Sequence, residues 1–159
     1  MNNVENQERV AGPILALDLG QKLVGAAVCD ALLISITKLD PLRRTNWKQL
    51  LRDVTDLARR LDAKTLVIGF PLSLNGFRGT AALEAQRTAQ NFARSLKLPV
   101  YLQDERLTSI EAEERLRAAG HRPAEMRALI DSQAAAIILQ DFISGGQQRV
   151  LIQTSVDDA

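Results

Sequence analysis

Cysteine, histidine and aromatic residues are scarce in this chain of 159 residues, and their scarcity excludes several kinds of site. The only cysteine is Cys29, and the only histidine is His121. One cysteine cannot form an internal disulfide, and these two residues cannot build a cysteine-rich zinc site or a zinc-protease signature. Aromatic residues make up 4% of the chain, too few for rows of rings that stack single-stranded bases. Any chemistry therefore falls to carboxylates and hydroxyls.

Long apolar runs are also missing. No stretch of about 18 apolar residues occurs, and Met1–Glu8 is polar, unlike the core of a signal peptide. We therefore expect a soluble, cytoplasmic protein with no membrane partner. The net charge is only +1, but Pro13–Arg149 holds 19 basic and 15 acidic residues, so the expected folded part is more basic than the whole.

The length suggests one globular domain with a single core. Residues 13–144 form the expected domain. Residues 1–12 and 145–159 are polar and lack sustained periodicity, so we expect flexible tails there, although Val150–Ile152 could add a short edge strand.

Short apolar runs at the start of the expected domain predict three antiparallel strands. The runs are Ile14–Leu19, Val24–Cys29 and Leu32–Thr37, and Asp40–Pro41 is expected to close this region. The spacing between the runs suits a meander.

Helices and strands alternate in the rest of the chain. The first helix has Thr45 or Asn46 as its N-cap and is expected to place Trp47 in the core. The later predictions are a strand at Thr65–Phe70, a helix at Thr80–Leu96 with Leu83 inward, a strand at Val100–Gln103, a helix from the capping box Thr108–Glu111 to Gly120, and a buried helix at Ala134–Phe142. This order predicts an α/β, ribonuclease H-like fold, with a mixed five-stranded sheet and helices on both faces.

Three carboxylates stand where burial is expected. Asp18 interrupts an apolar strand, Glu105 follows a strand at its carboxyl end, and Asp131 shares a helix face with apolar residues. Each acid also has a purely structural interpretation. Asp18 could accept hydrogen bonds in a turn, Glu105 could form a salt bridge, and Asp131 could be the N-cap of the last helix. Asp104 competes with Glu105, because neighbouring residues of a strand face opposite sides.

The predicted order of elements brings these acids together. The first strand is expected beside the one that precedes Glu105, with the last helix over their shared end. Like charges that close would raise one another's pKa, whereas divalent cations would restore the ionised forms. All-oxygen ligands select Mg²⁺ or Mn²⁺, and two such ions would support hydrolysis of a phosphodiester bond.

Four sequence blocks resemble the YqgF/RuvX family, over a stretch from about Ile14 to Phe142. The blocks are Leu17–Ala27, Val67–Gly76, Asp104–Thr108 and Ile130–Ala135. The family is described as nucleases of the 16S ribosomal RNA precursor and as Holliday junction resolvases, with a ribonuclease H-like fold. The resemblance implies that Asp18, Glu105 and Asp131 are the catalytic, metal-binding residues, the same three acids that the burial argument selects.

Basic residues near these blocks are candidates for substrate binding. Lys22 precedes Leu23, a position where many family members carry Arg, and is therefore the nearer candidate for a phosphate contact. Arg78 lies in the loop after the Thr65–Phe70 strand, and Arg106 follows the Val100–Gln103 strand. Alternatively, Arg78 could be an ordinary loop residue without substrate contact. Arg106 could orient the Glu105 carboxylate rather than hold a phosphate.

The residues and the resemblance together predict a divalent-metal-dependent nuclease of RNA, acting in 16S ribosomal RNA precursor processing with two Mg²⁺ or Mn²⁺ ions. Two alternatives stay open. A Holliday junction resolvase would cut branched DNA as a homodimer, because two-fold symmetry matches the symmetric strands. The other is a nucleic-acid-binding module without catalysis.

Overall fold

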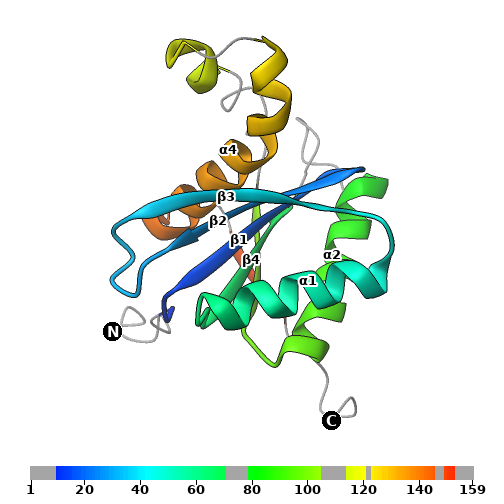
Figure 1. Ribbon diagram of the computed structural model, residues 1–159. Coiled ribbons are helices and arrows are strands. Elements are labelled where there is room, and N and C mark those ends of the chain that lie inside the picture. Colours follow the sequence, from blue (N-terminus) through cyan, green and yellow to red (C-terminus); the bar gives the residue numbers. More distant parts are fainter. Residues whose placement is uncertain (1–9, 71–78, 105–113, 121–122, 146–148, 153–159) are drawn as a thin grey trace.

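The computed structural model describes residues 10–70, 79–104, 114–120, 123–145 and 149–152. Its elements follow one another as β1 (Ile14–Leu19), β2 (Leu23–Cys29), β3 (Ile36–Arg43), α1 (Trp47–Arg60), β4 (Thr65–Phe70), α2 (Thr80–Leu96), β5 (Val100–Asp104), α4 (Pro123–Ser144) and β6 (Arg149–Ile152). The strands form one sheet, with α1 and α2 on one face and α4 on the other (Figure 1).

Strand β1 lies inside this sheet, whose order is β3-β2-β1-β4-β5-β6. It pairs antiparallel with β2 and parallel with β4, and β4 pairs parallel with β5. The mixed sheet is the predicted one, but it has six strands rather than five. The sixth is β6, which pairs antiparallel with β5 and lies in the segment expected to be a tail.

The third strand starts and ends later than expected. Asp30 Oδ1 accepts hydrogen bonds from the backbone N–H groups of Ile34 and Ser35, so this part of the predicted strand belongs to the connection. Strand β3 then continues through Pro41, and its register against β2 shifts by one residue between Leu39 and Leu42. A proline fits there because β3 is an edge strand with a bulge, where a missing N–H costs least.

Helix α1 begins as predicted, with Asn46 rather than Thr45 as its N-cap. The Asn46 Oδ1 accepts a hydrogen bond from the backbone N–H of Gln49 at 2.9 Å. Two inward predictions are wrong: Trp47 is 36% exposed, and Leu83 on α2 is 52% exposed. Trp47 is the first residue of α1, and Leu83 lies beside the buried face of α2, which is formed by Ala82, Ala85, Ala89 and Phe92.

The core has two layers, one on each face of the sheet. Leu15 and Leu17 of β1 pack with residues of α1 and α2, whereas Ile14 and Ala16 pack with residues of α4. This alternation follows from the two-residue period of a strand. Strand β1 is therefore buried on both sides, which explains its nearly continuous apolar sequence.

Residues 114–118 are helical, and the turn that follows ends at Gly120, whose φ of 86° is typical of a helix stop. The capping box Thr108–Glu111 lies outside the described residues. None of the helices within the described ranges combines the length and the apolar composition that crossing a bilayer requires.

Candidate functional site

Asp18 lies near the carboxyl end of β1 and is partly exposed, unlike the fully buried residues before it. Ile14 and Ala16 pack on the α4 side, so strand alternation places Asp18 on that side too. The backbone N–H of Gly20 donates to the Asp18 carbonyl at 3.1 Å and starts a tight turn into β2. The carboxylate therefore sits where the central strand of the sheet reaches the surface.

Glycines flank Asp18 on both neighbouring strands. Gly25 of β2 is its registered partner, and continuing the β1–β4 register by one step puts Gly69 on the other side. Neither residue has a side chain to cover the carboxylate. A glycine inside a strand commonly marks a place where a ligand or another backbone approaches closely. Both glycines are buried, so the partly exposed Asp18 is the member of this row that reaches the surface.

Gln103 completes this row on β5, because Gly69 and Gln103 are registered partners. Two strand spacings separate the backbones of Asp18 and Gln103, about 10 Å. Gln103 is fully buried, and neither Oε1 nor Nε2 has a hydrogen-bond partner among the described residues. A buried amide left in that state costs roughly 1–3 kcal/mol, so its position calls for a functional explanation.

Asp104 faces the opposite side of the sheet from Asp18. It alternates with Gln103 and shares its face with Leu102, which packs in the α1 and α2 layer. Asp104 is 4% exposed. Glu105 lies outside the described residues, so its role stays a prediction, but the placement of Asp104 removes the competing carboxylate from the Asp18 face.

Asp131 lies on α4, one turn before Ala135. Ala135, Ile138 and Phe142 all pack in the α4 layer, as the predicted shared face requires, but the description does not cover the Asp131 side chain. Among the side chains that are described, no three acidic, histidine or cysteine residues group as metal ligands would. The other two acids of the predicted cluster, Glu105 and the Asp131 side chain, lie outside the described part of the chain.

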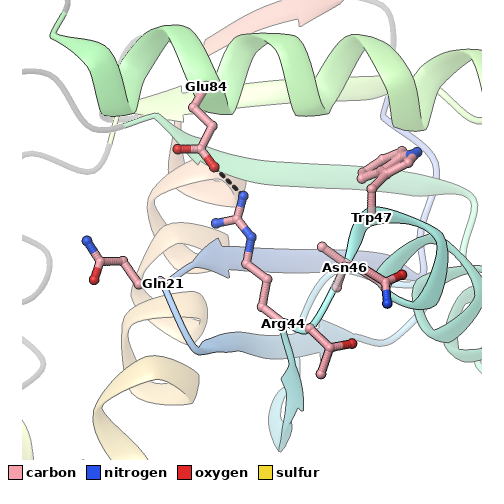
Figure 2. Close-up of a pocket in the computed structure, with 7 residues that line it drawn as sticks. Gln21, Arg44, Asn46, Trp47 and Glu84 are labelled. Atoms are coloured by element: carbon pink, nitrogen blue, oxygen red, sulfur yellow. Dashed lines mark hydrogen bonds and ion pairs between the residues drawn. The ribbon is translucent and has the colours of Figure 1, made fainter.

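Lys22 is exposed in the turn between β1 and β2, close in sequence to Asp18. Arg44 holds this turn from outside: its Nη1 donates to the Gly20 carbonyl at 2.9 Å, and its backbone N–H donates to the Lys22 carbonyl at 2.9 Å. Arg44 also pairs with Glu84 of α2 (Figure 2). The other two predicted substrate contacts, Arg78 and Arg106, lie outside the described residues.

The shifted pKa values belong to the far end of the sheet. Burial raises the pKa of the Cys29 thiol, and hydrogen bonds from the backbone of Ser35 and Ile34 lower the pKa of Asp30. Cys29 pairs along β2 with the beginning of β1, whereas Asp18 is near its end. These groups therefore act on the fold and lie away from the candidate site.

Sequence reasoning overlooked Gly25, Gly69, Gln103 and Arg44. The two glycines carry a readable signal, because each interrupts an otherwise apolar strand. A polar residue at the end of the β5 strand is a weaker signal for Gln103. Nothing local marks Arg44 among the many basic residues nearby, because its partners Gly20 and Glu84 are 24 and 40 positions away.

Comparisons with known proteins agree with this arrangement. A model of the RuvX family, described as "Holliday junction resolvase", matches residues 12–145. A protein of Gloeothece citriformis named "Putative pre-16S rRNA nuclease" is 40% identical over 152 residues, which cover 96% of this chain and 98% of that protein.

Among solved structures, Thermus thermophilus RuvC in complex with a Holliday junction substrate aligns with a TM-score of 0.56 at 15% identity, covering 86% of this chain and 98% of RuvC. The fowlpox virus Holliday junction resolvase aligns with a TM-score of 0.51 at 14% identity, covering 83% and 98%. These likenesses show a shared, ribonuclease H-like resolvase fold. With the family match over most of its length and a relative at 40% identity, the chain belongs to the RuvX family of nucleases.

Proposed function

We propose that this protein is a divalent-metal-dependent nuclease that hydrolyses phosphodiester bonds of RNA during maturation of the 16S ribosomal RNA precursor. The observation that carries the proposal is the setting of Asp18: a carboxylate at the surface end of the central strand, with Gly25 and Gly69 beside it. No neighbouring strand residue places a side chain beside this carboxylate, and Asp18 is itself partly exposed to an approaching phosphate.

The residues around Asp18 fit hard divalent cations. The donors are carboxylate oxygens, which Mg²⁺ and Mn²⁺ prefer, and Asp18 is partly exposed at the end of its strand. The buried amide of Gln103 in the same row adds an oxygen that has no other partner among the described residues. In the proposal Asp18 would hold two ions, and Glu105 and Asp131 would each complete the ligands of one.

Bound metal would supply a water-derived nucleophile and charge stabilisation at phosphorus. Asp18, Glu105 and Asp131 orient that chemistry, while Lys22, Arg78 and Arg106 hold the phosphate groups of the substrate. The water oxygen forms a bond to phosphorus, the bond from phosphorus to the 3′ oxygen breaks, and that oxygen takes up a proton. The products then carry a 5′-phosphate and a 3′-hydroxyl.

Replacement of Asp18 tests the proposal directly. We expect Asp18→Asn to reduce RNA cleavage in Mg²⁺ or Mn²⁺ by at least about 100-fold, because a neutral amide holds these cations poorly. The matched control is Asp56→Asn, which removes an exposed carboxylate from α1. Circular dichroism should show both variants folded. Full activity of Asp18→Asn, or of the wild type in metal-free buffer, would contradict the proposed mechanism.

The alternative substrate is a branched DNA junction. It is favoured by the description of the matching family as a Holliday junction resolvase and by the RuvC-like fold. Cleavage of structured RNA, single-stranded RNA and a mobile four-way junction should be compared in parallel, with sedimentation to measure the oligomeric state. The proposal expects cleavage of RNA over the junction, whereas cleavage of the junction alone by a dimer would establish the resolvase.

A binding module without catalysis is separated by the same assays. It predicts tight binding of nucleic acid in EDTA and no cleavage with any divalent cation. We expect cleavage instead, because the three acids that the family resemblance assigns to catalysis are all present in this chain.

A further inference from the structure

A cavity of about 310 Å³ opens beside the turn between β1 and β2, and its volume is at the low end for small-molecule pockets. Figure 2 shows Glu84 reaching down from α2 toward Arg44, with Gln21 on one side and Trp47 on the other. The cavity is lined by Gln21, Arg44, Thr45, Asn46, Trp47, Leu50 and Glu84. The helices α1 and α2, the β1–β2 turn and the connection from β3 to α1 thus line one cavity.

Trp47 gives this cavity an aromatic wall. Its ring packs against Phe92 with centroids 4.9 Å apart and planes tilted by 57°, which anchors the indole. The residue is nevertheless 36% exposed, so part of the ring is open to a ligand. An anchored and partly exposed indole can stack a planar ring without ordering a flexible side chain.

The charges in the cavity favour a neutral ligand. The Arg44 guanidinium pairs with the Glu84 carboxylate and also donates to the Gly20 carbonyl. The positive charge is offset by its partner, so a phosphate would have to compete with a carboxylate for Arg44. Gln21 adds an amide and Thr45 a hydroxyl, which can donate to and accept from the polar edge of a nucleobase. Asn46 adds amide N–H donors, because its Oδ1 already accepts from the Gln49 N–H.

The cavity adjoins the end of β1 that carries Asp18. Gln21 follows Asp18 by three positions, and the intervening Gly20 is held by both the Asp18 carbonyl and Arg44. Asp18 faces the α4 side, whereas Leu50 of the cavity packs in the α1 and α2 layer. A nucleic acid strand that crosses the β1–β2 turn would therefore pass from the face that carries Asp18 to the face that carries the cavity.

We propose that this cavity binds one unpaired nucleobase of the RNA substrate, next to the phosphate that is cleaved, by stacking on Trp47. The inference rests on the proposed RNA nuclease function and adds a subsite to it. It predicts that an unpaired nucleotide beside the cleavage position is preferred over a paired one, because only an unpaired base can leave its stack.

Trp47 is the only tryptophan of the chain, so its fluorescence reports on the cavity alone. We would titrate the wild-type protein in EDTA with a short single-stranded oligoribonucleotide of mixed sequence and with an abasic oligomer of the same length. The proposal expects saturable quenching by the RNA and little by the abasic oligomer. Unchanged fluorescence at RNA concentrations that saturate binding by anisotropy overturns it. Equal quenching by both oligomers also overturns it, in favour of phosphate binding.

Two variants sharpen the test. Trp47→Leu should weaken RNA binding about 10-fold through lost stacking, and Trp47→Tyr should restore most of the affinity. The dependence of affinity on salt should stay the same in Trp47→Leu, because stacking releases no counterions. Leu32→Ala, which shortens an exposed side chain outside the cavity, is the control. An affinity loss equal to that of Leu32→Ala would overturn the subsite, and the wild-type titration decides if Trp47→Leu does not fold.

Cleavage assays on the same preparations separate this inference from the proposed function. Metal-dependent cleavage that requires Asp18, together with unchanged Trp47 fluorescence, would remove the subsite and leave the nuclease. Quenching by RNA but not by the abasic oligomer, together with no cleavage under any divalent cation, would support the subsite and refute the nuclease.

Discussion

Asp18 and Gln103 are the two residues of the described structure on which the proposed chemistry depends most. They lie in one row across β1, β4 and β5, and the residue between them, Gly69, has no side chain. The row therefore places no strand side chain between a partly exposed carboxylate and a buried amide. The buried Gln103 amide lowers the stability of the fold, because it has no hydrogen-bond partner among the described residues. Stability alone therefore does not explain a glutamine at this position.

The Gln103→Leu substitution separates a stabilising role from a functional one. We expect the free energy of unfolding to rise by about 1 kcal/mol, because leucine fills a similar volume without unsatisfied polar atoms. We expect RNA cleavage to fall by about 10-fold, as when a group that orients metal ligands is lost. Urea unfolding and cleavage rates measure the two effects.

Gln90→Leu is the matched control, because Gln90 is half-buried on α2, on the other face of the sheet. It should leave cleavage unchanged. If Gln103→Leu stabilises the protein and cleaves RNA at the wild-type rate, Gln103 has no part in the site.

The residue scale also shows what sequence could reach at this site. Asp18 can be recognised from the sequence, because a charged residue stands out within an apolar strand. The meaning of Gly25 and Gly69 depends on strand register, which pairs residues that are far apart along the chain. The roles of Glu105, Arg78 and Arg106 stay predictions, because these residues lie outside the described structure.

Two apolar strands and one periodic helix have the predicted bounds, whereas the last helix, expected at Ala134–Phe142, spans Pro123–Ser144. Strands β1 and β4 and helix α2 have the bounds expected from the sequence. Strand β3 was misplaced, because an edge strand is half solvated and its Pro41 resembles a stop signal. The sequence predicts β6 only as one option within a tail, because its four residues carry too little periodicity to decide.

The N-cap of α1 provides a test at the level of a single element. Asn46→Ala should lower the free energy of unfolding by about 1 kcal/mol, because the Gln49 N–H loses its acceptor. Thr45→Ala should change it by less than about 0.5 kcal/mol, as for an ordinary surface substitution. Chemical denaturation of both variants checks this. Equal losses would mean that Asn46 is not the effective cap.

The connection between β2 and β3 should make the stability of the fold depend on pH. Backbone hydrogen bonds lower the pKa of Asp30 below its ordinary 3.8, so its charged form is favoured in the folded state. The resulting stabilisation is complete above the unfolded pKa and is lost as the pH falls through the folded pKa. Asp30→Asn should therefore lower the melting temperature at pH 7, and the difference should shrink below about pH 4.

Thermal unfolding from neutral to acid pH measures this difference, with Asp56→Asn as an exposed control that lacks these hydrogen bonds. A difference between wild type and Asp30→Asn that stayed constant down to the lowest pH would contradict the assignment.

At the scale of the whole molecule, the near-neutral charge conceals an uneven distribution. If Asp18, Glu105 and Asp131 are set aside as metal ligands, Pro13–Arg149 keeps 19 basic residues against 12 acidic ones. A basic body around an acidic site suits a phosphodiester substrate, because basic residues attract the backbone while the acids retain cations.

The sheet order places the candidate site at the carboxyl ends of the parallel strands. Parallel pairing of β1, β4 and β5 places their carboxyl ends together, which is where open α/β sheets bind ligands. The turn held by Arg44 and the cavity beside Trp47 adjoin the same edge. One edge of the fold thus joins the candidate carboxylate site with the proposed base site.

A crystal structure of the wild-type protein soaked in Mn²⁺ tests the central claim most directly, because the anomalous signal locates each ion. The account predicts two Mn²⁺ ions roughly 4 Å apart, with Asp18 bound to both and with Glu105 and Asp131 each bound to one. Saturating Mn²⁺ with no ion at Asp18, in protein that cleaves RNA in the same buffer, would contradict it.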